Sequence, residues 1–220
     1  MKKRCAGYAL DYIKPKMMIG LGGGSTIAYL VALLREKQME ITIVTPSVQT
    51  AQRCREAGLH VVPMNEVFHV DVAFDGCDEV DEQLNALKSG GGIHTKEKII
   101  ATMADDYILL VDESKVSQKL TFKVPLVLEV LPEAQTKIKK EVRRLGHEII
   151  ERMSQTSDGY TYTANGNLLM EVTLRSAITT QEVLQQFSTM VGVVETSLFS
   201  QIVTKAIVAT ADGKRIIERG

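Results

Sequence analysis

The chain has 220 residues, of which 45% are hydrophobic and 24% are charged, and its formal net charge is −1 at pH 7. This composition is ordinary for a soluble globular protein and allows one substantial core, or a main domain with a small one. The balanced charge argues against the strongly basic surface of nucleic-acid-binding proteins and gives no electrostatic reason to expect a membrane partner.

The N-terminal segment, residues 1–15, starts with basic residues but contains no long apolar run. It therefore predicts an amphipathic helix rather than a signal peptide, and no later segment approaches membrane-spanning length. The cysteines, Cys5, Cys54 and Cys77, are odd in number and form no Cys-x-x-Cys pair, which argues against a disulfide framework and against a zinc site. We expect a cytoplasmic protein.

In the first half of the chain, short apolar runs alternate with segments of helical periodicity. Strands are predicted at residues 17–21, 41–44, 60–62, 70–74 and 107–111. Helices are predicted at residues 27–37, after Ser47 as far as Gly58, and from about Thr95. This alternation predicts an α/β fold with a doubly wound, mostly parallel, Rossmann-like sheet.

In the second half of the chain the pattern changes. Strand-like runs are predicted at residues 126–130, 148–151, 160–162 and 168–173, and helices at residues 134–145 and 180–188. The pair Asn165-Gly166 is a hairpin signal. This order predicts a small α+β domain, residues 125–195, inserted into a main α/β domain formed by residues 1–124 and 196–220.

A glycine-rich loop, Gly-Gly-Gly-Ser-Thr, follows the first predicted strand. Backbone amides at a helix N-terminus bind anions, and two hydroxyls add donors, so the loop predicts a site for the phosphate of a small molecule. The residues predicted to bind it are Gly23, Gly24, Ser25 and Thr26. A dinucleotide fingerprint would need glycine at Ser25 and an acid at Thr45, and a Walker A loop would need a lysine. A tight turn with glycines for packing alone is the alternative.

The connection from Asp75 to Lys98 carries clustered acids, a lysine, three glycines and a second acid–base pair. Long connections without regular structure are uncommon and usually functional, and ligands of open α/β sheets bind beyond the carboxyl ends of strands. The acids do not fit a calcium loop, because Gly76 directly follows the first of them. The alternative to a site here is a solvated acidic turn.

Several residues of this connection suit sugar chemistry. Carboxylates at a strand end can bind hydroxyls and move protons when a counter-charge such as Lys88 is near, and the glycine run allows close backbone approach. The acids beside Cys77 would raise its thiol pKa, which argues against a nucleophile. Glu97 is either a favourable charge in a first helical turn with Thr95 as N-cap, or a general base, and spacing alone leaves both open.

Four motifs carry a resemblance to a known family: GLGGGST, DGCDEVDEQLNALKSGGG, TKEKIIA and DESK. Together, in order and spacing, they resemble ribose-5-phosphate isomerase of the A type, and the resemblance covers essentially the whole chain. It implies interconversion of ribose 5-phosphate and ribulose 5-phosphate in the pentose phosphate pathway, without metal or organic cofactor. It also implies a sugar phosphate as the small-molecule partner, no nucleic-acid or membrane partner, and a homodimer or homotetramer.

The resemblance implies roles by position. Glu97 resembles the base that moves a proton between C2 and C1 through an enediolate, and Lys88 resembles the cation near the developing oxyanion. Asp75 and Asp78 resemble acids that bind hydroxyls and assist ring opening. The implied substrate-binding residues are Gly23, Gly24, Ser25, Thr26, Asp75, Gly76, Cys77, Asp78, Lys88, Ser89, Gly90, Gly91 and Lys115.

Three positions depart from the family pattern. Gly23 replaces a threonine, Cys77 replaces an alanine, and Ser89 replaces a glycine. Two other functions therefore stay open: a sugar-phosphate sensor without catalysis, and an isomerase for another phosphorylated sugar. Whether His94 compensates for the missing threonine hydroxyl is also open.

Overall fold

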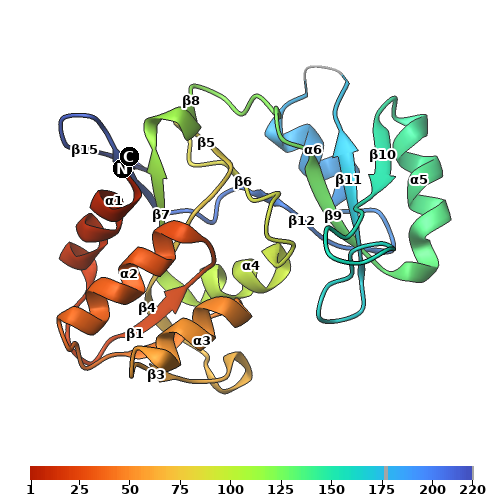
Figure 1. Cartoon of the computed structure of the whole chain (residues 1–220). Coiled ribbons are helices and arrows are strands. Elements are labelled where there is room, and N and C mark those ends of the chain that lie inside the picture. Colours follow the sequence, from red (N-terminus) through yellow and green to blue (C-terminus); the bar gives the residue numbers. More distant parts are fainter. Residues whose placement is uncertain (176–177, 220) are drawn as a thin grey trace.

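The computed structural model describes residues 1–175 and 178–219, which form three β-sheets (Figure 1). The largest has seven strands in the order β15-β14-β7-β4-β1-β2-β3. Its strands are β1 (Met18–Leu21), β2 (Thr42–Val44), β3 (His60–Val61), β4 (Val70–Asp75), β7 (Ala104–Asp112), β14 (Lys205–Ala209) and β15 (Lys214–Glu218). Every neighbouring pair is parallel except β14–β15, which confirms the predicted mostly parallel sheet.

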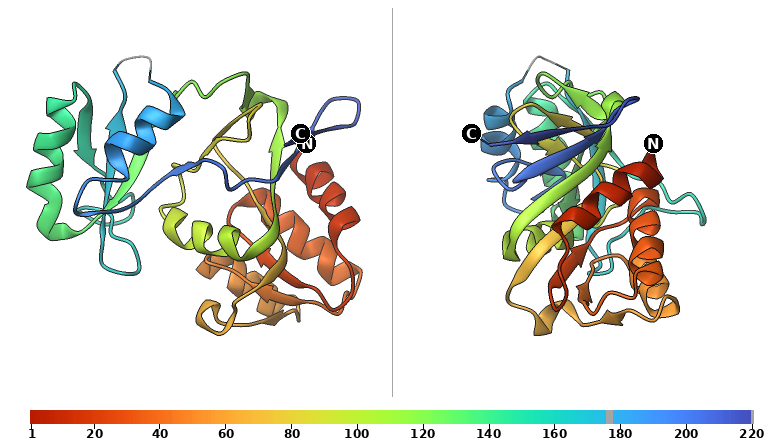
Figure 2. Two further views of the ribbon diagram at one scale, coloured as in Figure 1. Left: turned by 180° about the vertical axis from the view of Figure 1, so that it is seen from behind. Right: turned by 90° about the vertical axis from the view of Figure 1, so that its left-hand side faces the viewer.

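Helices cover both faces of this sheet (Figure 2). One face packs against α1 (Lys2–Ala9), α2 (Ser25–Glu36) and α3 (Val48–Glu56), and the other against α4 (His94–Met103). Short 3-10 turns are η1 (Leu10–Tyr12) and η2 (Met64–Glu66). Side chains of β7 alternate between the two cores, because successive residues of a strand point to opposite faces. Within the described residues, no helix has the length and apolar character needed to cross a membrane.

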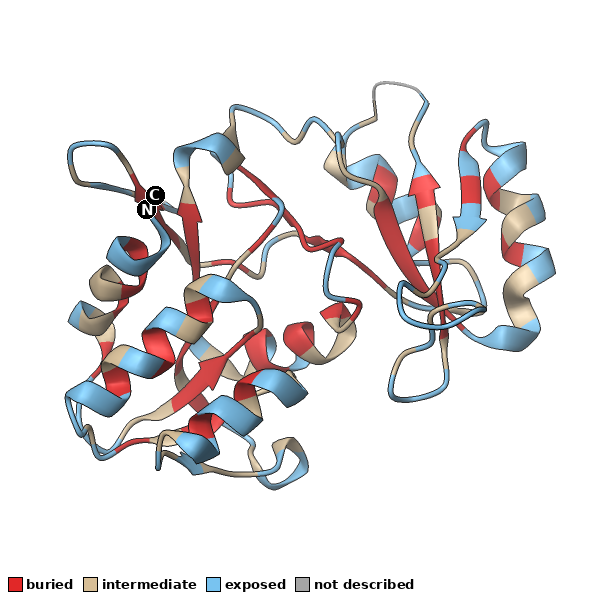
Figure 3. Cartoon of the chain, in the orientation of Figure 1, coloured by how far each residue is buried: buried red, intermediate tan, exposed pale blue. Residues whose placement is uncertain are grey.

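A second sheet takes two of its strands from the connection after β4. Its strands, in the order β13-β6-β5-β8, are β5 (Glu79–Asp81), β6 (Ala86–Leu87), β8 (Val116–Ser117) and β13 (Leu198–Phe199), and η3 (Glu113–Lys115) precedes β8. The expectation of a connection without regular structure is therefore wrong. The alternative of a solvated acidic turn does not fit Asp75, Glu79 and Asp81, which are buried, although Asp78 and Glu82 are exposed. Figure 3 shows how burial is distributed over the fold. The Asp81 carboxylate accepts hydrogen bonds from the backbone N–H groups of Gln83 and Asn85 within the hairpin turn, each at 2.9 Å.

The third sheet is antiparallel, with the order β10-β11-β9-β12, and it has a core of its own. Its elements are β9 (Leu126–Val130), η4 (Pro132–Ala134), α5 (Gln135–Arg144), β10 (Glu148–Glu151), β11 (Leu168–Thr173), α6 (Thr180–Phe187) and β12 (Val193–Thr196). The run at residues 160–162 forms only isolated bridges rather than a strand, and β12 was not expected. The domain limits stay a prediction.

The order of strands in the large sheet creates a switch point between β1 and β4. From β1 the chain proceeds outward through β2 to β3, whereas β4 leads through β7 to β14 on the other side. The loops that leave β1 and β4 therefore diverge and open a crevice, which is where open α/β sheets bind ligands. The glycine loop and the acidic connection meet at this point.

Candidate active site

A cavity of about 230 Å³ lies at the switch point, beyond the carboxyl ends of β1 and β4. Its lining includes all the predicted site residues except Ser89. These are Gly23, Gly24, Ser25, Thr26, Asp75, Gly76, Cys77, Asp78, Lys88, Gly90, Gly91, Glu97 and Lys115. Three further lining residues, Lys2, Ile93 and Leu110, were not predicted. They come from an N-terminal helix, a helix N-cap and a distant strand, so only the fold brings them here.

The glycine loop forms one wall of the cavity. Gly24 is the N-cap of α2 with φ of 93°, a left-handed conformation that favours glycine, and α2 begins at Ser25, earlier than expected. The first amides of a helix have no partner within it, so those of Ser25 and Thr26 remain available to an anion. Lys2 lines the same cavity and adds a positive charge.

Gly22, directly after β1, allows the Asp75 carboxylate to approach the loop. A Cβ atom on Gly22 would lie 2.0–2.2 Å from the carboxylate atoms of Asp75, so a side chain there would force the Asp75 carboxylate to move. The Gly22 N–H also donates to the Phe74 carbonyl at 2.9 Å, which fixes its position. The absence of a side chain at Gly22 therefore allows the Asp75 carboxylate to occupy its observed position.

We expect Gly22→Ala to lower kcat/KM for the sugar phosphate that the sequence motifs predict by about tenfold to a hundredfold, because displacing a group that positions a substrate by roughly 1 Å has effects of this size. The free energy of unfolding should fall by about 1–3 kcal/mol through overpacking. Steady-state kinetics and thermal unfolding measure both. The matched control is Gly7→Ala, where an added methyl meets nothing within 4 Å. Wild-type kinetics in Gly22→Ala would show that the Asp75 position is unimportant.

The centre of the cavity holds a lysine between two carboxylates. Lys88 Nζ lies 2.9 Å from Asp75 Oδ2 and 3.4 Å from Glu97 Oε1, and it donates to the Gly76 carbonyl at 2.5 Å. The three side chains are at most 6% exposed. Asp75 ends β4, Glu97 stands in the first turn of α4, and Lys88 follows β6. Three separate elements thus hold one buried charge cluster.

The pKa values of Glu97 and Lys88 are both raised above those of the free side chains. Burial, together with the Asp75 charge, raises the pKa of Glu97 to about 8, and Lys88 limits the rise. Burial alone would lower the pKa of Lys88, but the two carboxylates outweigh it and raise the pKa above its usual value. Lys88 is therefore a permanent cation near neutral pH, whereas Glu97 can exchange a proton there.

Tyr107 completes the surroundings of Asp75. Its hydroxyl donates to Asp75 Oδ2 at 3.0 Å, and its ring stacks on Phe199 with 5.9 Å between centroids. The hydroxyl is fully buried, and burial above all raises its pKa, so it stays a donor. Sequence reasoning assigned Tyr107 only to a strand. Its place on the α4-facing side of β7 follows from alternation, but its contact with Asp75 does not.

Cys77 and Lys115 contribute through backbone and charge. Burial, more than the neighbouring acids, raises the pKa of the Cys77 thiol to about 12, so the prediction against a nucleophile agrees in direction but not in main cause. Lys115 Nζ donates to the Cys77 carbonyl at 2.5 Å. This bond places the Lys115 ammonium at the rim of the cavity.

Ser89 and His94 lie outside the lining of the cavity. The Ser89 hydroxyl donates to the Pro125 carbonyl at 2.6 Å, so this hydroxyl is engaged within the fold, and the substrate contact of Ser89 stays a prediction. His94 is fully buried, with Nε2 3.4 Å from the Glu195 carbonyl oxygen, and it does not replace the missing threonine hydroxyl. Thr95 is not the N-cap either, because α4 starts at His94 and the Thr95 hydroxyl donates to Glu129.

Comparisons with known proteins identify the family of this chain. A sequence profile of ribose 5-phosphate isomerase A (phosphoriboisomerase A) matches residues 42–213. The chain belongs to the ribose 5-phosphate isomerase A family. Ribose-5-phosphate isomerase A of Lactococcus lactis subsp. cremoris (strain SK11) is 37% identical, and the match covers 100% of this chain and 99% of the relative.

Two solved structures of the family agree with this fold. Ribose 5-phosphate isomerase A of Methanocaldococcus jannaschii has a TM-score of 0.91 and 33% identity, over 99% of this chain and 98% of that one. A D-ribose-5-phosphate isomerase in complex with phospho-erythronic acid has a TM-score of 0.93 and 35% identity, over 99% and 97% of the two chains. The chain is thus an enzyme of the ribose 5-phosphate isomerase A family, as the sequence motifs predicted.

The departure from the ribose 5-phosphate isomerase pattern at Gly23 is not forced by packing. A Cβ atom at Gly23 would lie 3.8 Å from its nearest neighbour, Ser47, so a side chain would fit. The loop keeps the hydroxyls of Ser25 and Thr26 and its open helix N-terminus. The loss of the threonine hydroxyl therefore removes one donor and leaves the shape of the loop intact.

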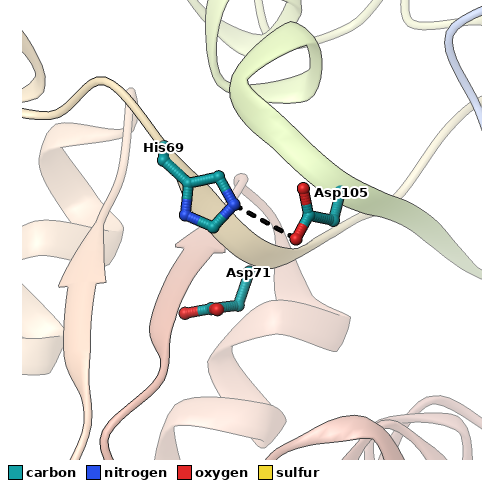
Figure 4. Close-up of side chains that lie close together, drawn as sticks. All are labelled: His69, Asp71 and Asp105. Atoms are coloured by element: carbon teal, nitrogen blue, oxygen red, sulfur yellow. Dashed lines mark ion pairs between the residues drawn. The ribbon is translucent and has the colours of Figure 1, made fainter.

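Outside the cavity, His69, Asp71 and Asp105 cluster at the amino ends of β4 and β7, the opposite edge of the sheet (Figure 4). Their possible metal-ligand atoms all lie within 4.8 Å of one another. His69 Nε2 lies 3.1 Å from Asp105 Oδ2, and Asp71 Oδ2 accepts the Met18 N–H at 2.7 Å. Because these contacts already engage the side chains, we interpret the cluster as a surface ion pair and assign no metal to it.

Proposed function

We propose that the chain interconverts D-ribose 5-phosphate and D-ribulose 5-phosphate through an enediolate, with Glu97 as the general base. The observation that carries the proposal is the position of Lys88 Nζ between the Asp75 and Glu97 carboxylates, inside a cavity whose other wall is an anion-binding loop. A base, a fixed cation and a phosphate site within one cavity are what this reaction needs.

Phosphate binding would place the reacting carbons. The free amides and hydroxyls of Ser25 and Thr26, together with Lys2, offer donors and positive charge to the phosphate. Binding energy from this remote group can hold C1 and C2 against Glu97. The relative that was solved with phospho-erythronic acid supports this assignment, because that ligand is a phosphorylated sugar acid.

The proton transfer starts at C2 of the open-chain aldose. Glu97 takes the C2 proton, the C–H electron pair forms the C1–C2 double bond, and the C1 carbonyl electrons move to O1. Lys88 stabilises this negative oxygen. Glu97 then returns the proton to C1, while the O2 proton is transferred to O1, and the ketose results. A pKa of about 8 suits both directions of the transfer near neutral pH.

Asp75 and Asp78 serve the hydroxyl groups of the sugar. Asp75 is held by the Tyr107 hydroxyl and by the Gly76 N–H, which donates to Oδ1 at 2.8 Å. Asp78 is exposed and lines the cavity, where its carboxylate can accept a hydrogen bond from a sugar hydroxyl and assist opening of the sugar ring. The two acids therefore act on the substrate before and after the proton transfer.

The direct test is an isomerase assay of the purified chain with ribose 5-phosphate in buffer that contains a chelator. We expect ribulose 5-phosphate to form, at a rate that exceeds those for other pentose and hexose phosphates. A higher rate with a different sugar phosphate would mean that the substrate assignment is wrong, whereas the proposed mechanism would still apply. Binding of ribose 5-phosphate without turnover would instead indicate a sensor.

A further inference from the structure

Arg152 links the small antiparallel sheet to the cavity. It directly follows β10, and its backbone is fixed by hydrogen bonds to Leu169 and Thr161. Its guanidinium donates through Nε to Glu171 Oε1 at 2.6 Å, through Nη2 to the Ser89 carbonyl at 2.6 Å and through Nη1 to the Gly90 carbonyl at 3.3 Å. The side chain is 15% exposed. Glu171 orients the guanidinium, and the guanidinium holds the start of the glycine run.

The opposite side of the same two residues is held by Asp78. Its Oδ2 accepts the N–H of Ser89 at 2.7 Å and the N–H of Gly90 at 3.0 Å. The backbone of Ser89 and Gly90 is thus held from two sides: the Arg152 guanidinium donates to its carbonyls, and the Asp78 carboxylate accepts from its N–H groups. Hydrogen bonds to charged groups are stronger than those between neutral groups, so both contacts are substantial.

The small sheet also shapes the end of the run. Gly92 has φ of 66°, and a Cβ atom there would lie 2.5 Å from Leu169 Cδ1 of β11. The Ser89 hydroxyl donates to the Pro125 carbonyl, just before β9. The glycine run therefore rests on three segments of the small sheet, and its free side forms a wall of the cavity through Gly90 and Gly91.

We propose that Arg152 is a positioning residue for sugar binding: it fixes the Ser89–Gly90 backbone, which in turn fixes Asp78 and the glycine wall of the cavity. Arg152 does not line this cavity. It lines an adjoining cavity that shares Asp78, Gly90 and Gly91 with it, and we assign its effect to the groups that it holds. This inference rests on the proposed function, in which Asp78 binds sugar hydroxyls. It gives the small domain a part in the active site.

The variant Arg152→Met removes every side-chain donor and keeps an unbranched apolar chain in place of the methylene groups. We expect KM for ribose 5-phosphate to rise about tenfold to a hundredfold, the range for losing hydrogen bonds that involve a charged group. We expect kcat to change much less, and the pH dependence of kcat/KM to stay as in the wild type, because Glu97 is untouched. Arg152→Lys keeps the positive charge but loses the planar guanidinium with its paired donors, so its KM should lie between those of the wild type and Arg152→Met.

Lys139→Met is the matched control. It removes an ion pair of the same small sheet, Lys139 Nζ to Glu151 Oε1 at 2.6 Å, and touches no residue of the glycine run. Thermal unfolding compares the loss of stability in the two variants, and KM should be unchanged in Lys139→Met. If Arg152→Met does not fold, Arg152→Lys carries the comparison.

Hydrogen exchange of the peptide that spans residues 88–93 tests the inference independently of catalysis. We expect faster exchange in Arg152→Met and wild-type exchange in Lys139→Met. Unchanged exchange, or a KM equal to that of the control, would overturn the positioning role. If the wild type neither binds nor converts ribose 5-phosphate, the proposed function fails, and the role of Arg152 in sugar binding fails with it even when the exchange result holds.

Discussion

Replacing Glu97 with glutamine is expected to lower kcat by about 10²–10⁴-fold, the contribution typical of a positioned general base. Glutamine keeps the shape of the side chain and an oxygen that can face Lys88 Nζ, now 3.4 Å from Glu97 Oε1, but it cannot accept a proton from carbon. The affinity for ribose 5-phosphate should survive, since the glycine loop, Asp75 and Asp78, the groups that we propose to bind the substrate, are intact. Steady-state kinetics and calorimetric binding separate the two effects.

The pH dependence gives this prediction a second readout. Glu97 must be ionised to act as base, and its pKa in the folded protein is raised to about 8. The wild-type kcat/KM should therefore rise with pH up to about 8 and level off above it, and the residual activity of Glu97→Gln should lack this rise. The raised pKa also means that the folded state favours neutral Glu97. Its contribution to stability thus falls as pH rises from about 4.5 through about 8, and the glutamine variant loses this dependence.

Glu79→Gln is the control for Glu97→Gln. Glu79 is a buried carboxylate of the same connection, but it accepts from the Ser117 hydroxyl at 3.0 Å and the Thr121 N–H at 2.6 Å, away from the cavity. Its replacement should affect stability and leave the pH profile as in the wild type. Turnover by Glu97→Gln within a factor of a few of the wild type would falsify the assignment of the base.

The sequence was informative where the signal is local. Alternating strands and helices predicted the parallel sheet, and the glycine loop and acidic connection predicted which segments meet at its edge, because βαβ order fixes where carboxyl ends lie. The short strands β5, β6 and β12 were missed for the opposite reason. They have only a few residues each, and pairing with distant partners such as β13 and β9 decides their conformation.

The chemistry of the site depended on burial that no spacing reveals. A glutamate in a first helical turn is common, and only its burial beside Asp75 raises its pKa to about 8, while Lys88 limits the rise. The Tyr107 hydroxyl reaches Asp75 from a neighbouring strand, and Arg152 reaches Ser89 across 63 positions of the sequence. Residue types along one segment therefore predicted the candidate catalytic groups, whereas packing between segments determines their contacts and pKa shifts.

Replacing Lys88 with methionine is expected to cost both activity and stability. The ammonium is the cation that the buried Asp75 and Glu97 carboxylates share. Removing one partner of a buried ion pair leaves uncompensated charge, which lowers the free energy of unfolding by about 3–5 kcal/mol. Loss of a donor at the developing oxyanion lowers kcat by about 10²–10³-fold. Chemical denaturation and steady-state kinetics measure the two effects.

Lys98→Met provides a close control for this change. Both lysines lie against the Phe199 ring: Lys98 Nζ is 5.2 Å from the ring centroid and Lys88 Nζ is 5.7 Å from it. Lys98 pairs with Glu195, whose side chain is 30% exposed and can be hydrated once the lysine is gone. The control should therefore lose less stability than Lys88→Met and keep wild-type turnover, because Lys98 does not line the cavity.

The pH dependence of stability separates lost charge compensation from lost packing in Lys88→Met. Without the ammonium, the buried carboxylates bind protons more tightly in the folded state than in the unfolded state, so the variant should recover stability as pH falls. Its deficit relative to the wild type should be smaller at pH 5 than at pH 8. A deficit that stays constant between these pH values would mean that Lys88 fills space without balancing Asp75 and Glu97, and its electrostatic role in the reaction would lose its support.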